Sequence, residues 1–211
     1  MLERHWERLE FPKILALLAG ETTYAVGREL ALQLRPMTTL QDAERAQQAT
    51  QEARRLLDLR PGLSLGKARD VRALARRASM GGVLTPGELL DVADTAAVAR
   101  SVKGTIDRLA DELPVLGAIA RRLRDHGDLE EAIRRAIGDG GEVLDEASPA
   151  LQRLRQDLRK THDRLMARLQ EIVNSPAYRS ALQDGIITLR EGRYVVPVKV
   201  ECRGQIKGIV H

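Results

Sequence analysis

Aromatic residues are scarce in this chain of 211 residues, where one Trp, one Phe and three Tyr account for about 2% of the total. Compact enzyme cores rely on aromatic rings, because each ring buries a large apolar area. Leu, Ala, Val and Ile supply most of the 43% of residues that are hydrophobic. This composition predicts long helices with narrow apolar stripes.

Cysteine and long apolar runs are also nearly absent. The single cysteine, Cys202, excludes an internal disulfide and a zinc site built from four cysteines. The longest apolar run, residues 14–19, is far shorter than the roughly 20 residues that span a bilayer. The first residues mix acids with bases and show no apolar signal-peptide segment. The sequence therefore predicts a cytoplasmic protein without a membrane partner.

Charge is nearly balanced overall, with 34 basic and 30 acidic residues, but it is unevenly distributed. Residues 148–211 carry twelve basic and six acidic side chains, whereas residues 1–147 carry 22 basic and 24 acidic ones. A basic C-terminal third favours an acidic partner such as nucleic acid. The alternative interpretation is that the arginines solvate a long helix, and charge alone does not decide between the two.

Apolar residues recur at helical spacing through residues 1–175. Shorter helices are predicted at residues 69–79, 105–111, 114–125 and 129–138. Proline and polar residues mark several helix starts, which are Pro12, Thr22 or Thr23, the pair Thr38 and Gln41, Thr85-Pro86-Gly87-Glu88, and Ser148-Pro149.

The longest predicted helix covers about residues 149–174. Its apolar residues form one seam, with Thr161 at a missing step, and they are Leu151, Leu154, Leu158, Leu165, Leu169, Ile172 and Val173. At ~1.5 Å per residue this helix is about 39 Å long. A single apolar stripe of that length needs a covering partner. We expect that partner in sequence outside this chain or in a second subunit.

After Pro176 the apolar period changes from helical to alternating. Residues 186–189 and 194–200 predict two antiparallel strands joined by a turn at residues 190–193. Val196, Val198 and Val200 would lie on one face, with Pro197 and Lys199 on the other. A second turn at residues 203–205 leads into a third predicted strand, residues 206–211. Because three short strands form a marginal sheet, we expect the chain to be a fragment.

The predicted fold class is therefore mainly α. It combines a helical core and long helices with a small antiparallel β-hairpin or meander at the C-terminal end.

The sequence shows no constellation of catalytic residues. Residues 62–68 are similar to a phosphate-binding loop, but the spacing is one residue short and Ala68 lacks the metal-binding hydroxyl. His5 and Glu7 have no Cys-x-x-Cys that would complete a deaminase zinc site. The four histidines lie far apart along the chain. We therefore predict no catalytic residue, no metal site and no cofactor in these residues.

The residues of the predicted hairpin carry a family resemblance. Residues 187–199, followed by Arg203-Gly204-Gln205 and residues 208–211, closely resemble the bacterial MutS-II family. Residues 9–15, 27–31, 34–36, 69–71 and 81–90 are similar to the same family, and the match is weakest at residues 100–147. This family consists of MutS-like proteins associated with suppressing recombination and with acting on stalled ribosomes.

The resemblance implies a domain organisation. Residues 1–105 would form a helical core, residues 106–182 lever helices, and residues 183–211 the start of a β clamp. The family's ATPase, which uses ATP and Mg²⁺, and its endonuclease domain lie C-terminal to this region. The resemblance also implies a homodimeric parent protein, in which a descending lever helix returns along residues 149–174.

Two functional hypotheses follow. In the first, basic lever and clamp surfaces contact the phosphates of branched or mismatched DNA or of ribosomal RNA. The predicted contact residues are Arg190, Arg193, Lys199, Arg203 and Lys207. Few aromatic residues flank them, so base stacking is not expected to dominate. A solvated surface is the alternative interpretation for each of these cations. In the second hypothesis, the chain is a structural and dimerisation module that couples a C-terminal ATPase to the clamp and has no ligand of its own.

Overall fold

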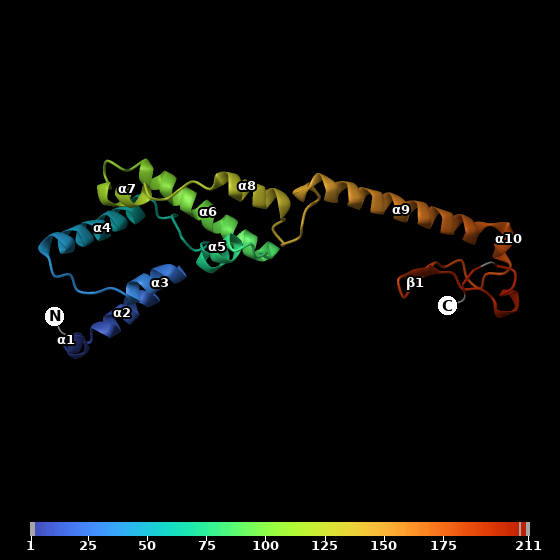
Figure 1. The fold of residues 1–211 in the computed structure, drawn as a ribbon, viewed down its shortest axis with the longest axis horizontal. Helices are drawn as coiled ribbons and strands as arrows, with labels where there is room; N and C mark the ends of the chain where they lie inside the picture. Colours follow the sequence, from blue (N-terminus) through green and yellow to red (C-terminus); the bar gives the residue numbers. More distant parts are fainter. Residues whose placement is uncertain (1–2, 207, 210–211) are drawn as a thin grey trace. The chain divides into compact units, whose positions relative to one another are not determined.

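The computed structural model describes residues 3–206 and 208–209 (Figure 1). These residues form ten α-helices and one two-stranded antiparallel sheet. The chain divides into two compact units, unit 1 at residues 1–147 and unit 2 at residues 148–211. The prediction of a mainly α fold with a small hairpin near the C-terminal end is confirmed.

Unit 1 is helical. Its helices are α1 (Glu3–Arg8), α2 (Phe11–Gly20), α3 (Ala25–Leu32), α4 (Leu40–Leu59), α5 (Arg72–Ser79), α6 (Pro86–Asp107), α7 (Pro114–Ala120) and α8 (Gly127–Ala136), followed by the 3-10 helix η1 (Asp145–Ala147). Helix α6 packs against both α7 and α8, α4 packs against α7, and α2 pairs with α3 (Figure 1).

Two apolar clusters stabilise the packing of unit 1. The first joins α4, α6 and α7 around Leu113, whose side chain is fully buried. The second joins α6 and the end of α8. The buried members are Leu56, Ile106, Leu113 and Ala120 in the first cluster, and Ala93, Ile133 and Ile137 in the second.

Two helix starts confirm the sequence signals. The Thr85 hydroxyl accepts the backbone N–H of Glu88, and the Glu88 carboxylate accepts the N–H of Thr85, which completes a capping box at α6. The Ser148 hydroxyl accepts the N–H of Leu151 at the start of α9 (Pro149–Asn174). Both caps satisfy backbone donors that the first helical turn leaves without a partner.

Two other predicted caps are wrong. Helix α4 is capped by Thr39, which accepts the N–H of Asp42, so the cap lies one residue beyond Thr38. Neither predicted threonine caps α3, because the Thr22 hydroxyl donates to the Ala19 carbonyl at 2.8 Å and completes the end of α2 instead.

Several predicted helix bounds also differ. Helix α6 continues to Asp107, so no separate helix begins at residue 105. Helix α7 ends at Ala120, where the N–H of Leu123 donates back to the Ala120 carbonyl in a turn. Helix α5 begins at Arg72 because Asp70 accepts its N–H and fixes the preceding segment as a turn. The assignment of residues 1–105, 106–182 and 183–211 to core, lever and clamp stays a prediction.

Unit 2 contains α9, α10 (Pro176–Arg179), β1 (Thr188–Arg190), β2 (Arg193–Val195) and the 3-10 helix η2 (Val200–Cys202). Strands β1 and β2 form a hairpin, residues 188–195, in which Thr188 pairs with Val195. Glu191 and Gly192 form its turn with φ of 47° and 75°. Two central residues with positive φ are what a two-residue hairpin turn of type I′ requires.

The second predicted strand is too long. Strand β2 ends at Val195, because the Pro197 carbonyl accepts the N–H of Gln183 and the N–H of Lys199 donates to the Ala181 carbonyl, each at 3.0 Å. Residues 197–199 therefore lie beside residues 181–183 instead of continuing along β1. The predicted third strand is not observed at residues 206, 208 and 209, and the rest of it lies outside the described residues.

Among the described residues, no helix combines the length and the apolarity that crossing a membrane requires.

Candidate nucleic-acid interface

Positive charge is concentrated in one of the two compact units. Unit 2 carries twelve basic and six acidic side chains, whereas unit 1 carries 22 basic and 24 acidic ones. The boundary between the units is therefore also a boundary in charge. A surface that binds polyanions is expected on unit 2.

The hairpin brings two of the predicted contact residues together. Arg190 and Arg193 are directly opposite each other in the β1–β2 register, one on each side of the turn, and both are exposed. Directly opposed residues project from the same face, with Cβ atoms roughly 4.5–5.5 Å apart. Two arginine side chains therefore project from one face of the hairpin beside its turn.

The other predicted contact residues are placed differently. The Lys199 ammonium donates to the Ser180 carbonyl at 2.9 Å, and the side chain is half-buried, so this lysine stabilises the packing of residues 197–199 on the end of α10. Arg203 is exposed and directly follows η2. Lys207 lies outside the described residues. The polar strand face on which Lys199 was expected does not form.

The hairpin is fixed against α9 by a contact between two ring side chains. The Tyr194 hydroxyl lies 3.1 Å from Nδ1 of His162, and the ring centroids are 5.9 Å apart. Nearer the end of α9, Val173, Ala181 and Leu182 are buried. The sequence pattern does not predict the His162 contact. It places Thr161 at the gap in the apolar seam between Leu158 and Leu165, but His162 is the residue that lies on the seam side there.

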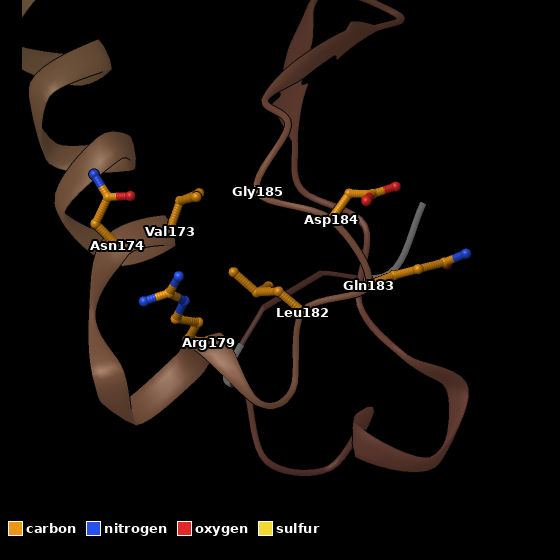
Figure 2. A pocket seen from close by; sticks show the side chains of 7 residues that line it. All are labelled: Val173, Asn174, Arg179, Leu182, Gln183, Asp184 and Gly185. Carbon is orange, nitrogen blue, oxygen red and sulfur yellow. The ribbon is translucent and has the colours of Figure 1, made fainter.

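A hollow of about 570 Å³ lies where α9, α10 and residues 182–185 meet (Figure 2). Arg179 and Asn174 line it on the helical side, and Asp184 belongs to the opposite segment. None of its seven lining residues is a Ser, Thr, Cys or His. The hollow therefore offers hydrogen-bonding groups, but its lining side chains include no ordinary nucleophile.

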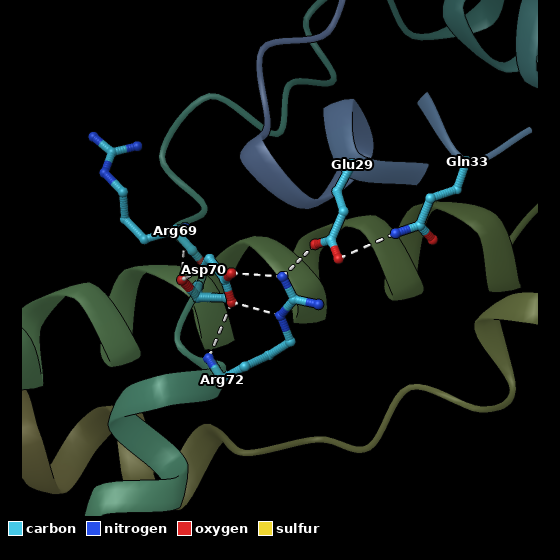
Figure 3. Close-up of polar contacts among 6 residues, drawn as sticks. Glu29, Gln33, Arg69, Asp70 and Arg72 are labelled. Carbon is cyan, nitrogen blue, oxygen red and sulfur yellow. Dashed lines mark hydrogen bonds and ion pairs between the residues drawn. The ribbon is translucent and has the colours of Figure 1, made fainter. Parts of the chain in front are cut away.

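In unit 1, Arg72 joins α3 to the segment before α5 (Figure 3). Its guanidinium lies 2.7 Å from Asp70 and 2.5 Å from Glu29, and Gln33 donates to Glu29 at 3.4 Å. The hydrogen bonds from the Arg72 side chain and backbone lower the pKa of Asp70 to about 2. The two carboxylates raise the pKa of Arg72. Asp70 lies in residues 69–71, one of the segments that resemble the MutS-II family, and it is thus part of a structural ion pair.

Further ion pairs of unit 1 join different helices. The Arg77 guanidinium contacts Glu88, and this hydrogen bond, with the one from the N–H of Thr85, lowers the pKa of Glu88 to about 2. Arg134 lies 2.5 Å from Asp94 on α6, and this contact raises its pKa despite an opposing effect of burial. Arg72, Arg77 and Arg134 of unit 1 are thus paired with carboxylates from other segments.

The described residues include no group of three or more His, Cys, Asp or Glu side chains that could hold a metal ion. The expectation that the chain holds no catalytic residue and no cofactor stays a prediction.

No protein-family model matches the chain. Curated relatives match it over nearly its whole length. "Endonuclease MutS2" of Symbiobacterium thermophilum is 46% identical over 211 residues, which are 100% of this chain and 26% of that protein. The proteins of the same name from Pelotomaculum thermopropionicum and Brevibacillus brevis are 41% identical over 205 residues and 37% identical over 213 residues. These alignments cover 97% and 100% of this chain, and 26% and 27% of the two relatives.

The resemblance carried by the hairpin residues is confirmed by these alignments, which also include residues 100–147, where the motifs are weakest. The chain spans about a quarter of the length of the curated relatives it matches. The 211 residues are therefore similar over nearly their whole length to about a quarter of each of these proteins named Endonuclease MutS2.

Proposed function

We propose that this chain comprises core, lever and clamp sequences of a MutS-like protein, and that its basic unit 2 contacts the phosphate backbone of DNA or ribosomal RNA. The observation that carries the proposal is the charge of unit 2, with twelve basic and six acidic side chains, beside a nearly balanced unit 1. Lysine and arginine contacts to phosphates dominate the affinity of proteins for nucleic acid.

Two further features support backbone contact. Arg190 and Arg193 share one face of the hairpin next to its turn, so two positive charges lie close together there. The nearest aromatic side chain, Tyr194, is engaged with His162, so the hairpin does not offer a free ring for base stacking.

The relatives carry the name endonuclease, which describes enzymes that act on nucleic acid.

Binding of the 211-residue chain to nucleic acid tests the proposal. Fluorescence anisotropy with duplex and four-way branched DNA, and co-sedimentation with ribosomes, would be measured between about 50 mM and about 200 mM salt. We expect binding that weakens steeply with salt, because each phosphate contact adds about 0.9 to the slope of log affinity against log salt. Undetectable binding to all three at low salt would contradict the proposal.

The hairpin contribution is tested by the variant R190Q/R193Q. Losing two phosphate contacts should reduce the magnitude of the salt slope by up to about 1.8. The matched control is R121Q/R122Q, which removes two exposed arginines of unit 1 and should bind as the wild type does. If the hairpin variant also binds as the wild type does, these two arginines are not contacts.

A second candidate function is dimerisation through α9. Leu154, Leu158 and Leu165 lie along its apolar seam and are 67%, 70% and 44% exposed. A second copy of the chain could cover this seam. The variant L158D/L165D should then shift the sedimenting species from dimer to monomer, while Q156D/Q170D, on another face of α9, should not. A monomeric wild type over the full concentration range would remove this candidate.

We also propose that the ATPase, which uses ATP and Mg²⁺, and the endonuclease activity of a longer parent protein depend on residues outside these 211. The chain alone should then neither hydrolyse ATP nor nick plasmid DNA in the presence of Mg²⁺. If the chain still hydrolyses ATP or nicks DNA after further purification, this assignment is contradicted.

A further inference from the structure

We infer that a line of basic side chains along α9 binds the phosphodiester backbone of a nucleic-acid double helix, with the backbone running along the helix axis. We call this line the α9 stripe, and it consists of Arg153, Lys160, Arg164 and Arg168. The inference rests on the proposed function and assigns to it a surface other than the hairpin.

The geometry of α9 places these four residues on one side. With 3.6 residues per turn they fall within an arc of about 80°, whose centre lies about 125° around the axis from that of the apolar seam. Lys160, Arg164 and Arg168 follow at four-residue intervals, so they are spaced about 6 Å apart along the axis. The whole stripe extends over about 22 Å.

The hairpin leaves the α9 stripe uncovered. It packs on the side of the apolar seam, where His162 contacts Tyr194 and where Met166 and Leu169 are half-buried. All four side chains of the stripe, by contrast, are exposed. Part of the seam side of α9 thus packs within unit 2, although Leu154 and Leu158 on that side are exposed, and the stripe side faces solvent.

Acidic residues only partly neutralise the stripe. Asp157 and Glu171 fall within the same arc, and Glu171 lies 2.7 Å from Arg168 in a pair whose side chains are 65% and 75% exposed. An exposed pair of this kind contributes little energy, so Arg168 can exchange its carboxylate for a phosphate at small cost. The stripe therefore keeps a net positive charge along its length.

The arrangement fits a regular polyanion better than a single anion. A duplex carries one phosphate per roughly 3.4 Å of axis on each strand, so a 22 Å stripe faces about six or seven base pairs. Helix α9 contains no Phe, Trp or Tyr, which leaves phosphate contact without base stacking. Contacts of this kind position a protein on nucleic acid but do not read its sequence.

The test compares K160Q/R164Q/R168Q with the wild-type chain in anisotropy titrations over a range of salt. Duplex DNA and duplex RNA of the same sequence serve as separate arms. We expect the affinity to fall at least about tenfold at low salt and the magnitude of the salt slope to fall by up to about 2.7. The control, R121Q/R122Q/R124Q, removes three exposed arginines of unit 1 and should keep both values.

Glutamine has a helix propensity close to that of arginine and lysine, so α9 should persist, and circular dichroism verifies it. If the triple variant loses helix content, the single variant R164Q replaces it and should lower the slope by about 0.9. A loss of affinity for only one of the two duplexes supports the inference and shows whether the α9 stripe binds DNA or RNA.

The inference and the proposed function fail in different ways. A wild-type chain that binds neither duplex contradicts the proposed function. A wild-type chain that binds, while the stripe variant keeps its affinity and slope, overturns the inference alone. Equal losses in the stripe variant and the unit 1 control also overturn it, because binding would then follow net charge rather than this surface.

Discussion

Glu52 should be a determinant of the packing of α4 on α7, although it is a carboxylate. Its side chain is buried, with 7% of its surface exposed. One carboxylate oxygen accepts the backbone N–H of Leu116 at 2.9 Å, and the other accepts the Gln48 amide at 3.0 Å. Leu116 lies in the first turn of α7, which has no side-chain cap of its own. Glu52 therefore caps a helix from a different segment of the chain.

The magnitude follows from that geometry. A hydrogen bond to a charged group contributes about 1.5–3 kcal/mol, and an anion near a helix N-terminus adds about 0.3–1 kcal/mol. Replacing Glu52 with Ala should therefore destabilise the docking of α7 by about 2–3 kcal/mol. Replacing it with Gln, which keeps one acceptor and the shape but loses the charge, should cost roughly half of that.

Amide hydrogen exchange at Leu116 reports this docking directly. Because about 1.4 kcal/mol corresponds to a factor of ten, Glu52→Ala should accelerate exchange by about 30-fold or more. Glu44→Ala, at an exposed position on the same helix, is the matched control and should leave the rate unchanged. Exchange at the wild-type rate in Glu52→Ala, or an equal acceleration in the control, would refute the capping role.

Three other changes have defined outcomes. Leu113→Ala should destabilise unit 1 by about 2–5 kcal/mol, because it removes a fully buried side chain, and an unchanged urea midpoint would contradict this. The lowered pKa of Asp70, about 2 instead of 3.8, means that its carboxylate stabilises the folded chain above pH 3.8 and that this contribution is lost as the pH falls towards 2. Asp70→Asn should therefore flatten the curve of stability against pH in that range, and a curve that keeps its slope would show that the bond from Arg72 contributes nothing. Glu191→Asn should slow amide exchange in the hairpin several-fold, because asparagine tolerates the positive φ that precedes Gly192 better than glutamate does. Unchanged or faster exchange would contradict this.

Local signals predicted the ends of the longest helix correctly. Ser148-Pro149 supplies both a hydroxyl cap and a first-turn proline, and Pro176 cannot continue the helix, so α9 covers residues 149–174 as predicted. The hairpin turn is a second local success. Glu191-Gly192 combines a glycine with flanking apolar alternation, and the φ values of both residues suit the turn.

Non-local partners account for the failures. Val196, Val198 and Val200 alternate as strand residues do, but alternation does not identify the strand with which they pair. Val198 forms its bridge with Leu182, and Val200 is 73% exposed. The burial of Glu52 is a failure of the same kind, because a glutamate on an amphipathic helix is expected on the polar face until α7 supplies its partner.

The predicted contact residues show that net charge predicts which unit is basic but not which cations are available to a ligand. The sum of charges gives unit 2 an excess of six positive side chains, but it does not distinguish a cation that stabilises the fold from one that faces solvent. Lys199 belongs to the first kind, since its ammonium is held by the Ser180 carbonyl. Arg190 belongs to the second kind, as do the four residues of the α9 stripe.

The i, i+4 spacing of Lys160, Arg164 and Arg168 is visible in the sequence, yet its meaning depends on which side of α9 is covered. The apolar seam on the same helix predicts packing along its whole length, and packing on either flank would bury part of the stripe. Because the Tyr194–His162 contact sets the hairpin on the seam side, the basic side stays open. The Tyr194–His162 contact and the exposed stripe thus lie on different sides of α9, and only the structure shows which side the hairpin covers.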